Sequence, residues 1–190
     1  MPPVVDAKPR EIVLATSNPA KRSQLRWLLD GLDLTVTEAP PRQVDEAASD
    51  FAGNASLKAL AYSEQGLSIA SDGGLEVPAL AGRWDPLLTR RQGRDYLSQL
   101  THDMADRRVR WIEAVAIADH GRITGCWTAS GTKGVLAPEP WPERPGHFWV
   151  WEVFLFPRLG KVWADLSPDE REQVDLTWLE LKRAVQGKLR

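Results

Sequence analysis

Ile69-Ala70-Ser71-Asp72-Gly73-Gly74-Leu75-Glu76-Val77 is the stretch that decides the fold, because strand-forming residues surround a carboxylate and two glycines. The apolar residues on either side predict two short buried strands, one ending near Ile69 and one over Leu75 to Leu80. Glycine lets the backbone approach a ligand closely, and α/β proteins bind ligands beyond the carboxyl ends of their strands. Asp-Gly-Gly is also an ordinary turn, so the other polar stretches of the chain must decide between a turn and a site.

The rest of the chain alternates between strand and helix patterns. A strand over Glu11 to Ala15 leads into a helix that starts at Asn18-Pro19, and Ser49 or Asp50 starts a second helix. The last helix starts with the capping box Ser167-Pro168-Asp169-Glu170. Together these patterns predict an α/β fold with a mixed β-sheet flanked by helices. The remaining predicted elements are a short helix over Arg94 to Leu100 and strands over Leu34 to Thr37, Val109 to Ala118, Ile123 to Thr128 and Phe148 to Phe156.

Charge, hydropathy and cysteine content narrow the class of protein. The 190 residues carry a net charge of -2, so no global field attracts a nucleic acid polymer or an anionic membrane. No apolar run approaches the ~18 residues that a membrane span needs. The single Cys126 suits a reducing compartment, which predicts a cytoplasmic protein. Residues 1–10 are predicted to be a flexible Pro-rich tail, and residues 11–190 a single domain.

The corner Thr16-Ser17-Asn18-Pro19-Ala20-Lys21 joins a predicted strand to a predicted helix. Its hydroxyls, its amide, the N–H groups of the helix start and Lys21 together favour an anion such as a phosphate. The corner is not a Walker loop, because the glycines and the Lys-Ser/Thr pair are missing. The alternative is a plain helix cap with a solvated lysine.

Two carboxylates and a lysine follow in the next segments. Asn54 and Lys58 are four residues apart and therefore share one face of the second predicted helix. Glu46 and Asp72 are predicted to hold a divalent cation together with substrate phosphates, because Mg²⁺ typically takes one or two protein carboxylates. The alternative is a solvated lysine and two unrelated surface acids.

The aromatic segment Phe148 to Phe156 combines stacking surfaces with a carboxylate. In the predicted strand, Trp149 and Trp151 point to one face and Glu152 to the other. Tryptophan rings stack on flat bases, and a nearby carboxylate accepts hydrogen bonds from ring N–H groups. Part of the segment is expected to belong to the core instead.

Taken in order, these stretches resemble the inosine/xanthosine triphosphate pyrophosphatases over about Ile12 to Ala184. The phosphate corner is similar to the family's Thr-Gly-Asn-x-x-Lys, with Ser17 at the glycine. Glu46 and the run Phe51 to Ala59 resemble its Glu followed by Phe-x-x-Asn-Ala-x-x-Lys-Ala. The opening stretch resembles its Ala-Asp-Asp-Ser-Gly-Leu-Glu-Val, and Gly160 to Pro168 resembles its Gly-Lys-Thr-Phe-Ala-Glu-Leu-Ser-Pro.

The resemblance implies a Mg²⁺-dependent hydrolase that cleaves a nucleoside triphosphate into a monophosphate and pyrophosphate. It also implies a homodimer and an elongated mixed sheet with two lobes and a central active-site cleft. Glu46 and Asp72 would hold the metal and orient the attacking water, with Lys58 as the third catalytic residue. The implied substrate-binding residues are Thr16, Ser17, Asn18, Lys21, Gly73, Arg90 (which fits the family's Ser-x-Arg), Trp149, Trp151, Glu152, Arg171, Leu176 and Thr177.

The departures from the family concentrate at the end that reads the base. The family's Ser-His-Arg falls on Asp175-Leu176-Thr177, its Tyr/Trp-Asp falls on Trp151-Glu152, and Arg171 keeps a basic position one turn earlier. In the metal motif, the first Asp is Ser71 and the Ser is Gly73. A site that lacks its hydrogen-bond donors loses discrimination for the purine oxygen. We therefore expect a non-canonical or modified nucleotide as substrate, with a base preference unlike the usual inosine and xanthosine.

Two other functions stay open at this level. Ser71 removes one carboxylate near the metal, so the chain can also be a catalytically silent nucleotide-binding protein of the same fold. The exposed, proline-rich loop from Pro138 to Pro145 leaves room for a third interpretation as an interaction module.

Overall fold

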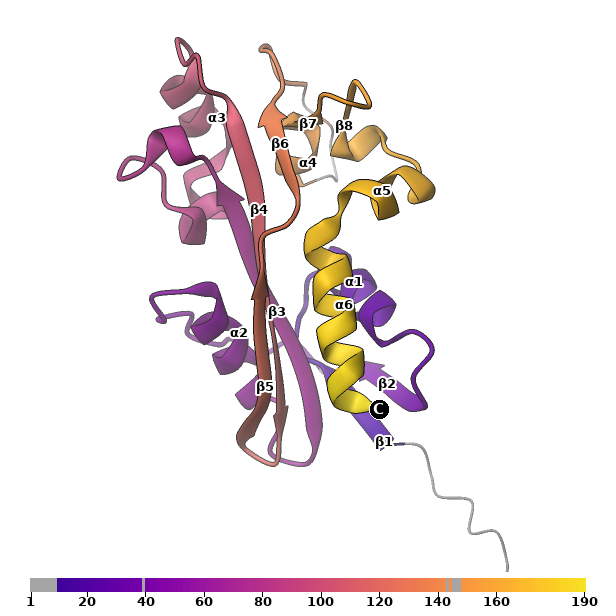
Figure 1. Cartoon of the computed structure of the whole chain (residues 1–190). Coiled ribbons are helices and arrows are strands. Elements are labelled where there is room, and N and C mark those ends of the chain that lie inside the picture. The colour runs from indigo at the N-terminus through magenta and orange to yellow at the C-terminus, as the bar shows by residue number, and fades with distance from the viewer. Residues whose placement is uncertain (1–9, 39, 143, 145–147) are drawn as a thin grey trace, which may run out of the picture. The chain divides into compact units, whose positions relative to one another are not determined.

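The structure, a computed structural model, describes residues 10–38, 40–142, 144 and 148–190. These residues form an eight-stranded sheet in the order β2-β1-β3-β4-β6-β7-β8, with β5 paired to β4, and helices flank its strands (Figure 1). The predicted mixed α/β sheet is confirmed. The chain divides into two compact units: unit 1 contains the chain up to Asp72, Val115–Trp127 and Lys182–Arg190, and unit 2 contains Gly73–Ala114 and Thr128–Leu181. The assignment of residues 11–190 to a single domain stays a prediction.

Unit 1 is built on parallel strands. β1 (Arg10–Leu14) pairs in parallel with β2 (Leu34–Glu38) and with β3 (Leu67–Glu76). In this register Leu14 lies opposite Ile69. Thr16 and Asp72, which follow these two residues, are therefore brought to the same edge of the parallel strands.

The helices of unit 1 begin where the sequence predicts. Asn18 caps α1 (Pro19–Leu29) by accepting a hydrogen bond from the N–H of Ala20 at 3.0 Å. Asp50 caps α2 (Phe51–Leu60) by accepting from Gly53 at 2.6 Å. Both helix starts depend on a capping side chain within the first few residues, so the local sequence is enough to predict them. At the other end of the chain, Gln186 of α6 (Leu176–Leu189) donates to two backbone carbonyls at the end of α1, those of Leu28 and Asp30, at 3.1 and 2.8 Å.

β4 (Arg108–Asp119) and β5 (Arg122–Ala129), which cover two of the predicted strands, form a hairpin. Its two-residue turn places His120 at φ 46° and Gly121 at φ 74°. Two successive left-handed residues match the twist of antiparallel strands, which is why Gly suits the second position.

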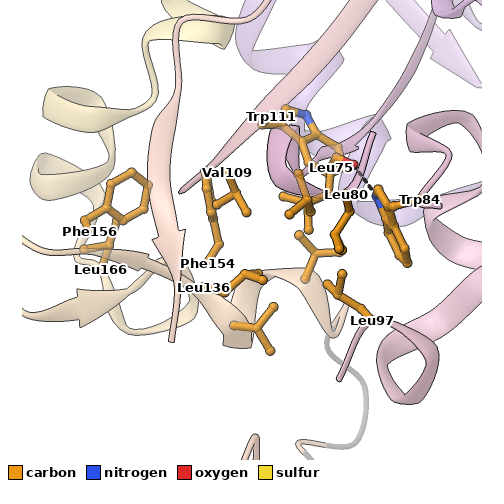
Figure 2. Packing of buried hydrophobic residues seen from close by; sticks show 13 residues of the cluster. Leu75, Leu80, Trp84, Leu97, Val109, Trp111, Leu136, Phe154, Phe156 and Leu166 are labelled. Atoms are coloured by element: carbon orange, nitrogen blue, oxygen red, sulfur yellow. Dashed lines mark hydrogen bonds between the residues drawn. The ribbon is translucent and has the colours of Figure 1, made fainter. Parts of the chain in front are cut away.

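Unit 2 has a hydrophobic core in which tryptophan takes a large share (Figure 2). Trp84 and Trp111 are buried together with Leu75, Leu97 and Phe154. The Trp84 Nε1–H donates to the Leu75 carbonyl at 2.7 Å, drawn as the dashed line in Figure 2. An indole can be buried in this way because its only polar group has a partner.

The other elements of unit 2 are short. α5 begins with the predicted capping box, in which Ser167 and Glu170 satisfy each other's backbone N–H groups. β6, β7 and β8 pair in antiparallel order. The elements are the 3₁₀ helices η1 (Pro78–Leu80), η2 (Pro86–Leu88) and η3 (Trp163–Asp165), the helices α3 (Thr89–Thr101), α4 (Val150–Val153) and α5 (Pro168–Val174), and the strands β6 (Lys133–Leu136), β7 (Phe154–Phe156) and β8 (Lys161–Val162).

Two strand predictions are wrong in ways that bear on the site. β3 is one continuous strand from Leu67 to Glu76, so Asp72 lies within a strand rather than in a turn between two strands. The segment from Phe148 to Phe156 is not a strand throughout, because the helical turn α4 precedes β7. Trp149 and Trp151 therefore do not alternate along a strand. The prediction was wrong because a run of bulky aromatic residues is compatible with a buried helical turn as well as with a strand.

Smaller differences follow from weak local signals. α3 begins at Thr89 rather than Arg94 and continues through a kink at Gly93, where φ is 79°. β6 was not predicted, because Lys133-Gly134 lacks strand preference. Arg10 belongs to β1, while residues 1–9 of the predicted tail, parts of the Pro138 to Pro145 loop (residues 143 and 145) and residue 147 lie outside the described residues. Within the described ranges, no helix has the length and apolar character to cross a bilayer.

Candidate functional site

The corner after β1 is organised by its own hydrogen bonds. The N–H of Asn18 donates to Thr16 Oγ1 at 3.2 Å, and Arg22 Nε donates to the Thr16 carbonyl at 2.9 Å. Thr16 and Asn18 are half-buried, and Ser17 is exposed. The first turn of α1 carries no acidic residue, so the positive end of the helix dipole is not offset by one. Binding of an anion at this corner stays a prediction.

Lys58 joins the two predicted metal carboxylates. Its Nζ lies 2.8 Å from Asp72 Oδ1 and 3.1 Å from Glu46 Oε2. Lys21 Nζ donates to the Ser71 carbonyl at 3.3 Å and lies 3.7 Å from Asp72 Oδ1. Four residues that are far apart in the sequence thus form one charged cluster inside unit 1. We call Lys21, Glu46, Lys58 and Asp72 the charged cluster.

Burial differs across the charged cluster. The side chains of Asp72, Lys58 and Lys21 are 12%, 15% and 18% exposed, whereas that of Glu46 is 50% exposed. Ion pairs strengthen as water is removed, so the lysine contacts of Asp72 are the stronger ones. Asp72 is thus the fixed carboxylate of the cluster, and Glu46 the more accessible one.

Asn54 holds the loop that carries Glu46. Its side chain is buried, and its Oδ1 accepts a hydrogen bond from the backbone N–H of Ala48 at 3.1 Å. The sequence placed Asn54 and Lys58 on one face of the second predicted helix. In the structure Lys58 reaches the carboxylates, while Asn54 Oδ1 fixes the backbone next to Glu46.

In unit 2, the predicted base-binding residues lie in a network of aromatic contacts. The ring centroids of Trp111 and Trp163 each lie 4.6 Å from that of Trp151. Arg171 Cζ lies 4.2 Å from the centroid of Trp163, a cation–π contact that extends the stack. Trp151 therefore packs against two other tryptophans of its own unit. Arg90 is exposed, with its Cζ 5.8 Å from the Phe148 ring centroid.

Leu176 and Thr177, at the positions of the family's His-Arg, have opposite environments. Leu176 is 50% exposed and Thr177 is fully buried. Thr177 Oγ1 accepts from the N–H of Thr132 at 2.9 Å and donates to the Trp111 carbonyl at 3.3 Å. The N–H of Thr177 donates to Thr132 Oγ1 at 3.0 Å. The polar groups of Thr177 are thus used inside unit 2, which favours a structural role.

Asp175 sits at the break between α5 and α6. Burial raises the pKa of Asp175 to about 6, and the nearby charge of Glu113 adds to this increase. Hydrogen bonds from Thr132 Oγ1, at 2.8 Å, and from the Trp178 backbone act in the opposite direction, as does the charge of Arg171. Asp175 therefore holds a proton more tightly in the folded chain than in the unfolded chain.

The raised pKa of Asp175 implies that ionisation of this side chain destabilises the folded chain, and the variant Asp175→Asn tests this. Because the folded-state pKa, about 6, exceeds the ordinary value of 3.8, the stabilising contribution of Asp175 is complete below pH 3.8 and is lost as pH rises through 6. Asparagine does not ionise, so we expect Asp175→Asn to be more stable than the parent by roughly 1–3 kcal/mol at pH 8. Urea unfolding of parent and variant at pH 8 and pH 4 measures the difference in their free energies of unfolding, and this difference should disappear at pH 4. An equal gain at both pH values would contradict the assignment.

Gly73 lies against the backbone and a buried carboxylate of the neighbouring strand. A Cβ at Gly73 would lie 2.1 Å from Glu113 Oε2 and 2.6 Å from the Ile112 carbonyl oxygen. Trp111 Nε1 donates to Glu113 Oε2 at 2.8 Å. Close packing within unit 2 therefore accounts for the glycine. The predicted role of Gly73 in substrate binding stays a prediction.

Sequence reasoning missed Trp111, Glu113 and Thr132, which support the predicted residues of unit 2. Glu113 is 1% exposed in the middle of the apolar strand β4. A single acid inside an apolar strand pattern was an available signal, because buried carboxylates require specific partners. Trp111 and Thr132 carried no comparable signal, since their partners lie far away in the sequence.

Comparisons with known proteins show relatives that match most of the chain. The chain matches the family model described as the Ham1 family over residues 12–177. A dITP/XTP pyrophosphatase of Gloeobacter violaceus is 38% identical over 173 residues, which cover 86% of this chain and 87% of that protein. One of Geobacillus kaustophilus is 35% identical over 183 residues, with 87% of each chain covered.

Solved structures give the same result for the fold. The Staphylococcus aureus Ham1 protein has a TM-score of 0.73 at 25% identity, and the match covers 94% of this chain and 99% of that one. A HAM1 protein from Coxiella burnetii has a TM-score of 0.75 at 22% identity, with the same coverage. The resemblance found in the sequence motifs is confirmed, and the chain belongs to the Ham1 family.

Proposed function

We propose that this protein hydrolyses a nucleoside triphosphate to a nucleoside monophosphate and pyrophosphate, with Mg²⁺ as cofactor. The observation that carries the proposal is the charged cluster, in which Lys58 joins Glu46 and Asp72 while Lys21 of the phosphate corner approaches Asp72. The names of the relatives, dITP/XTP pyrophosphatases, support the same reaction. Such a site matches the needs of phosphoryl chemistry, which are positioning and charge neutralisation.

Glu46 and Asp72 fit a magnesium ion. Both supply the oxygen ligands that Mg²⁺ prefers, and both approach a single ammonium group, at 3.1 and 2.8 Å. Within the described part of the chain, no group of three or more His, Cys, Asp or Glu side chains offers a fuller ligand set. Two carboxylates suffice for Mg²⁺, which keeps waters and substrate phosphates in its other positions. When bound, the ion neutralises phosphate charge and polarises phosphate oxygens.

The chain's own residues bind and orient the triphosphate, and one of them accepts a proton. Thr16, Ser17, Asn18 and the N–H groups at the start of α1 hold phosphate oxygens, and Lys21 and Lys58 offset their charge. The charged cluster alone has two positive and two negative side chains, so a triphosphate brings excess negative charge and requires a further cation.

The reaction adds water across one phosphoanhydride bond. The water oxygen bonds to the α-phosphorus while the bond from this phosphorus to the α,β-bridging oxygen breaks, and pyrophosphate leaves. A carboxylate of the Glu46–Asp72 pair accepts the proton of that water. Lys58 and Lys21, whose Nζ atoms lie 2.8 and 3.7 Å from Asp72 Oδ1, hold the Asp72 carboxylate in position.

A substrate panel tests the proposal. Pyrophosphate and monophosphate are measured with canonical, deaminated, methylated and pyrimidine triphosphates, in Mg²⁺ and in excess EDTA. We expect release from one or a few substrates, loss in EDTA and recovery when Mg²⁺ is restored. Release of orthophosphate instead, or nucleotide binding in calorimetry without any product, would contradict the proposed hydrolase. The latter result would favour the catalytically silent binding protein.

We further propose that the enzyme is a homodimer in the cytoplasm. The family resemblance favours the dimer, and the single Cys126 favours a reducing compartment. Sedimentation of the purified chain tests the first part, and fractionation of cells tests the second.

A further inference from the structure

Arg22 reaches back from α1 to the corner that precedes this helix. Its Nε donates to the Thr16 carbonyl at 2.9 Å, and its Nη1 lies 2.6 Å from Glu38 Oε2. Helix side chains lean toward the N-terminus of their helix, so a long side chain in the first turns can reach the preceding segment. Glu38 ends β2, and in the parallel register it lies opposite Leu14, two residues before Thr16. Arg22 therefore links the corner to the neighbouring strand, and we call Arg22 and Glu38 the bridge.

The bridge holds the Thr16–Ser17 peptide group by its carbonyl. Residues 16–18 lie outside helix and strand, so no ladder of backbone hydrogen bonds fixes this peptide group. The peptide bond is trans, and the N–H of a planar trans peptide points away from its C=O. Because Arg22 holds the Thr16 carbonyl, the N–H of the exposed Ser17 is directed away from Arg22.

The bridge is itself held in place at its carboxylate. Arg26, one turn further along α1, donates to Glu38 Oε1 at 2.8 Å. This hydrogen bond lowers the pKa of Glu38, and the charges of Arg22 and Arg26 add to the effect, while burial acts in the opposite direction. Glu38 is thus an ionised anchor at neutral pH. A planar guanidinium has several N–H groups in a fixed arrangement, so Arg22 can hold a carbonyl and a carboxylate at the same time.

We infer that Arg22 is a positioning residue for phosphate binding, which orients the Ser17 N–H toward a phosphate oxygen, and that Glu38 fixes Arg22. This inference rests on the proposed function and deepens it. If the peptide group turned over, the Thr16 carbonyl oxygen would face the phosphate and repel it. A donor that is oriented before the anion arrives needs no rearrangement when it binds. Neither bridge residue belongs to the motifs that carry the family resemblance, so the bridge adds a residue pair that those motifs do not contain.

The test compares Arg22→Met with Arg26→Met. Methionine removes the guanidinium and keeps an unbranched side chain that favours a helix. Arg26→Met is the matched control, because it removes the same charge from the same helix, and among the described residues Arg26 donates to Glu38 rather than to the corner.

The kinetic constants are measured with the triphosphate that the parent protein turns over fastest. We expect Arg22→Met to raise KM about 10- to 100-fold, as for the loss of a hydrogen bond to a charged group. Its kcat should change less than about threefold, because the bridge does not contact the carboxylates that accept the proton. Arg26→Met should keep both constants within about threefold of the parent.

Arg22→Lys separates position from charge. Lysine keeps the positive charge but lacks the planar fork that holds two acceptors, so we expect it to restore KM only in part. Full restoration by lysine would show that charge alone matters, and would overturn the inference. A merely structural role would lower the fraction of folded enzyme, which reduces the apparent kcat and leaves KM unchanged, and this result would overturn the inference as well.

Binding of inorganic triphosphate, measured by calorimetry with Mg²⁺, separates this inference from the proposed reaction, because this probe carries phosphates without a base. If the parent protein turns over no nucleotide but Arg22→Met alone weakens binding of the probe about 10-fold or more, hydrolysis fails and the inference stands. Equal losses in Arg22→Met and Arg26→Met would overturn the inference and leave the reaction in place. A parent protein that binds no triphosphate, inorganic or nucleoside, would overturn both.

Discussion

Replacing Asp72 by asparagine is expected to lower the rate of pyrophosphate release by about a thousandfold or more. Asparagine keeps the size of the side chain and an oxygen that can accept from Lys58, whose Nζ lies 2.8 Å from Asp72 Oδ1. It loses the negative charge, and with it a strong ligand for a divalent cation and a proton acceptor. The loss is therefore expected in kcat, measured at saturating Mg²⁺, rather than in folding.

Asp50→Asn is the matched control for this variant. Asp50 is also in unit 1, but it caps α2 by accepting from Gly53, a role that asparagine fills equally well. Its activity should remain within about twofold of the parent, in line with a neutral surface change. If Asp72→Asn kept more than a tenth of the parental rate, the charged cluster would not be the catalytic centre.

The parts of the site that sequence predicts best are those fixed by neighbouring residues. The Asn18 and Asp50 caps, the Ser167 capping box and the His120-Gly121 turn depend on a few consecutive residues, and all are present. The approach of Lys58 to Glu46 and Asp72 joins three separate segments. The order of the motifs along the chain indicated that these segments come together, because parallel strands bring their carboxyl ends to one edge of the sheet.

The aromatic part of unit 2 could not be predicted in the same way. A run such as Phe148-Trp149-Val150-Trp151 is apolar in every position, so its periodicity does not separate a strand from a helical turn. The turn α4 is selected by tertiary contacts, such as the packing of Trp151 against Trp111 and Trp163. Those contacts also decide which buried polar atoms of this segment, such as Trp149 Nε1, lack a hydrogen-bond partner among the described residues.

Substituting alanine for Gly73 is expected to destabilise the protein by about 3 kcal/mol, at the upper end for adding a methyl group to a packed interior. The new Cβ would lie 2.1 Å from Glu113 Oε2 and 2.6 Å from the Ile112 carbonyl oxygen. The carboxylate cannot turn away without leaving Trp111 Nε1, 2.8 Å from the same oxygen, and the carbonyl belongs to the backbone of β4. Urea unfolding measures the change, and the melting temperature should fall by roughly 6–12 °C.

Two further variants test whether the clash with β4 causes the loss of stability in Gly73→Ala. Gly187→Ala, at a position with no atom within 4 Å of the added Cβ, should be neutral or slightly stabilising because alanine favours a helix. Introduced into Glu113→Ala, the change Gly73→Ala should cost less stability than in the parent, but it should still be destabilising because the Ile112 carbonyl stays in place. If Gly73→Ala instead folded with full stability and only weakened nucleotide binding, Gly73 would serve the ligand and not the contact between strands. The difference between the costs of Gly73→Ala in the parent and in Glu113→Ala therefore separates the contribution of the buried carboxylate from that of the backbone.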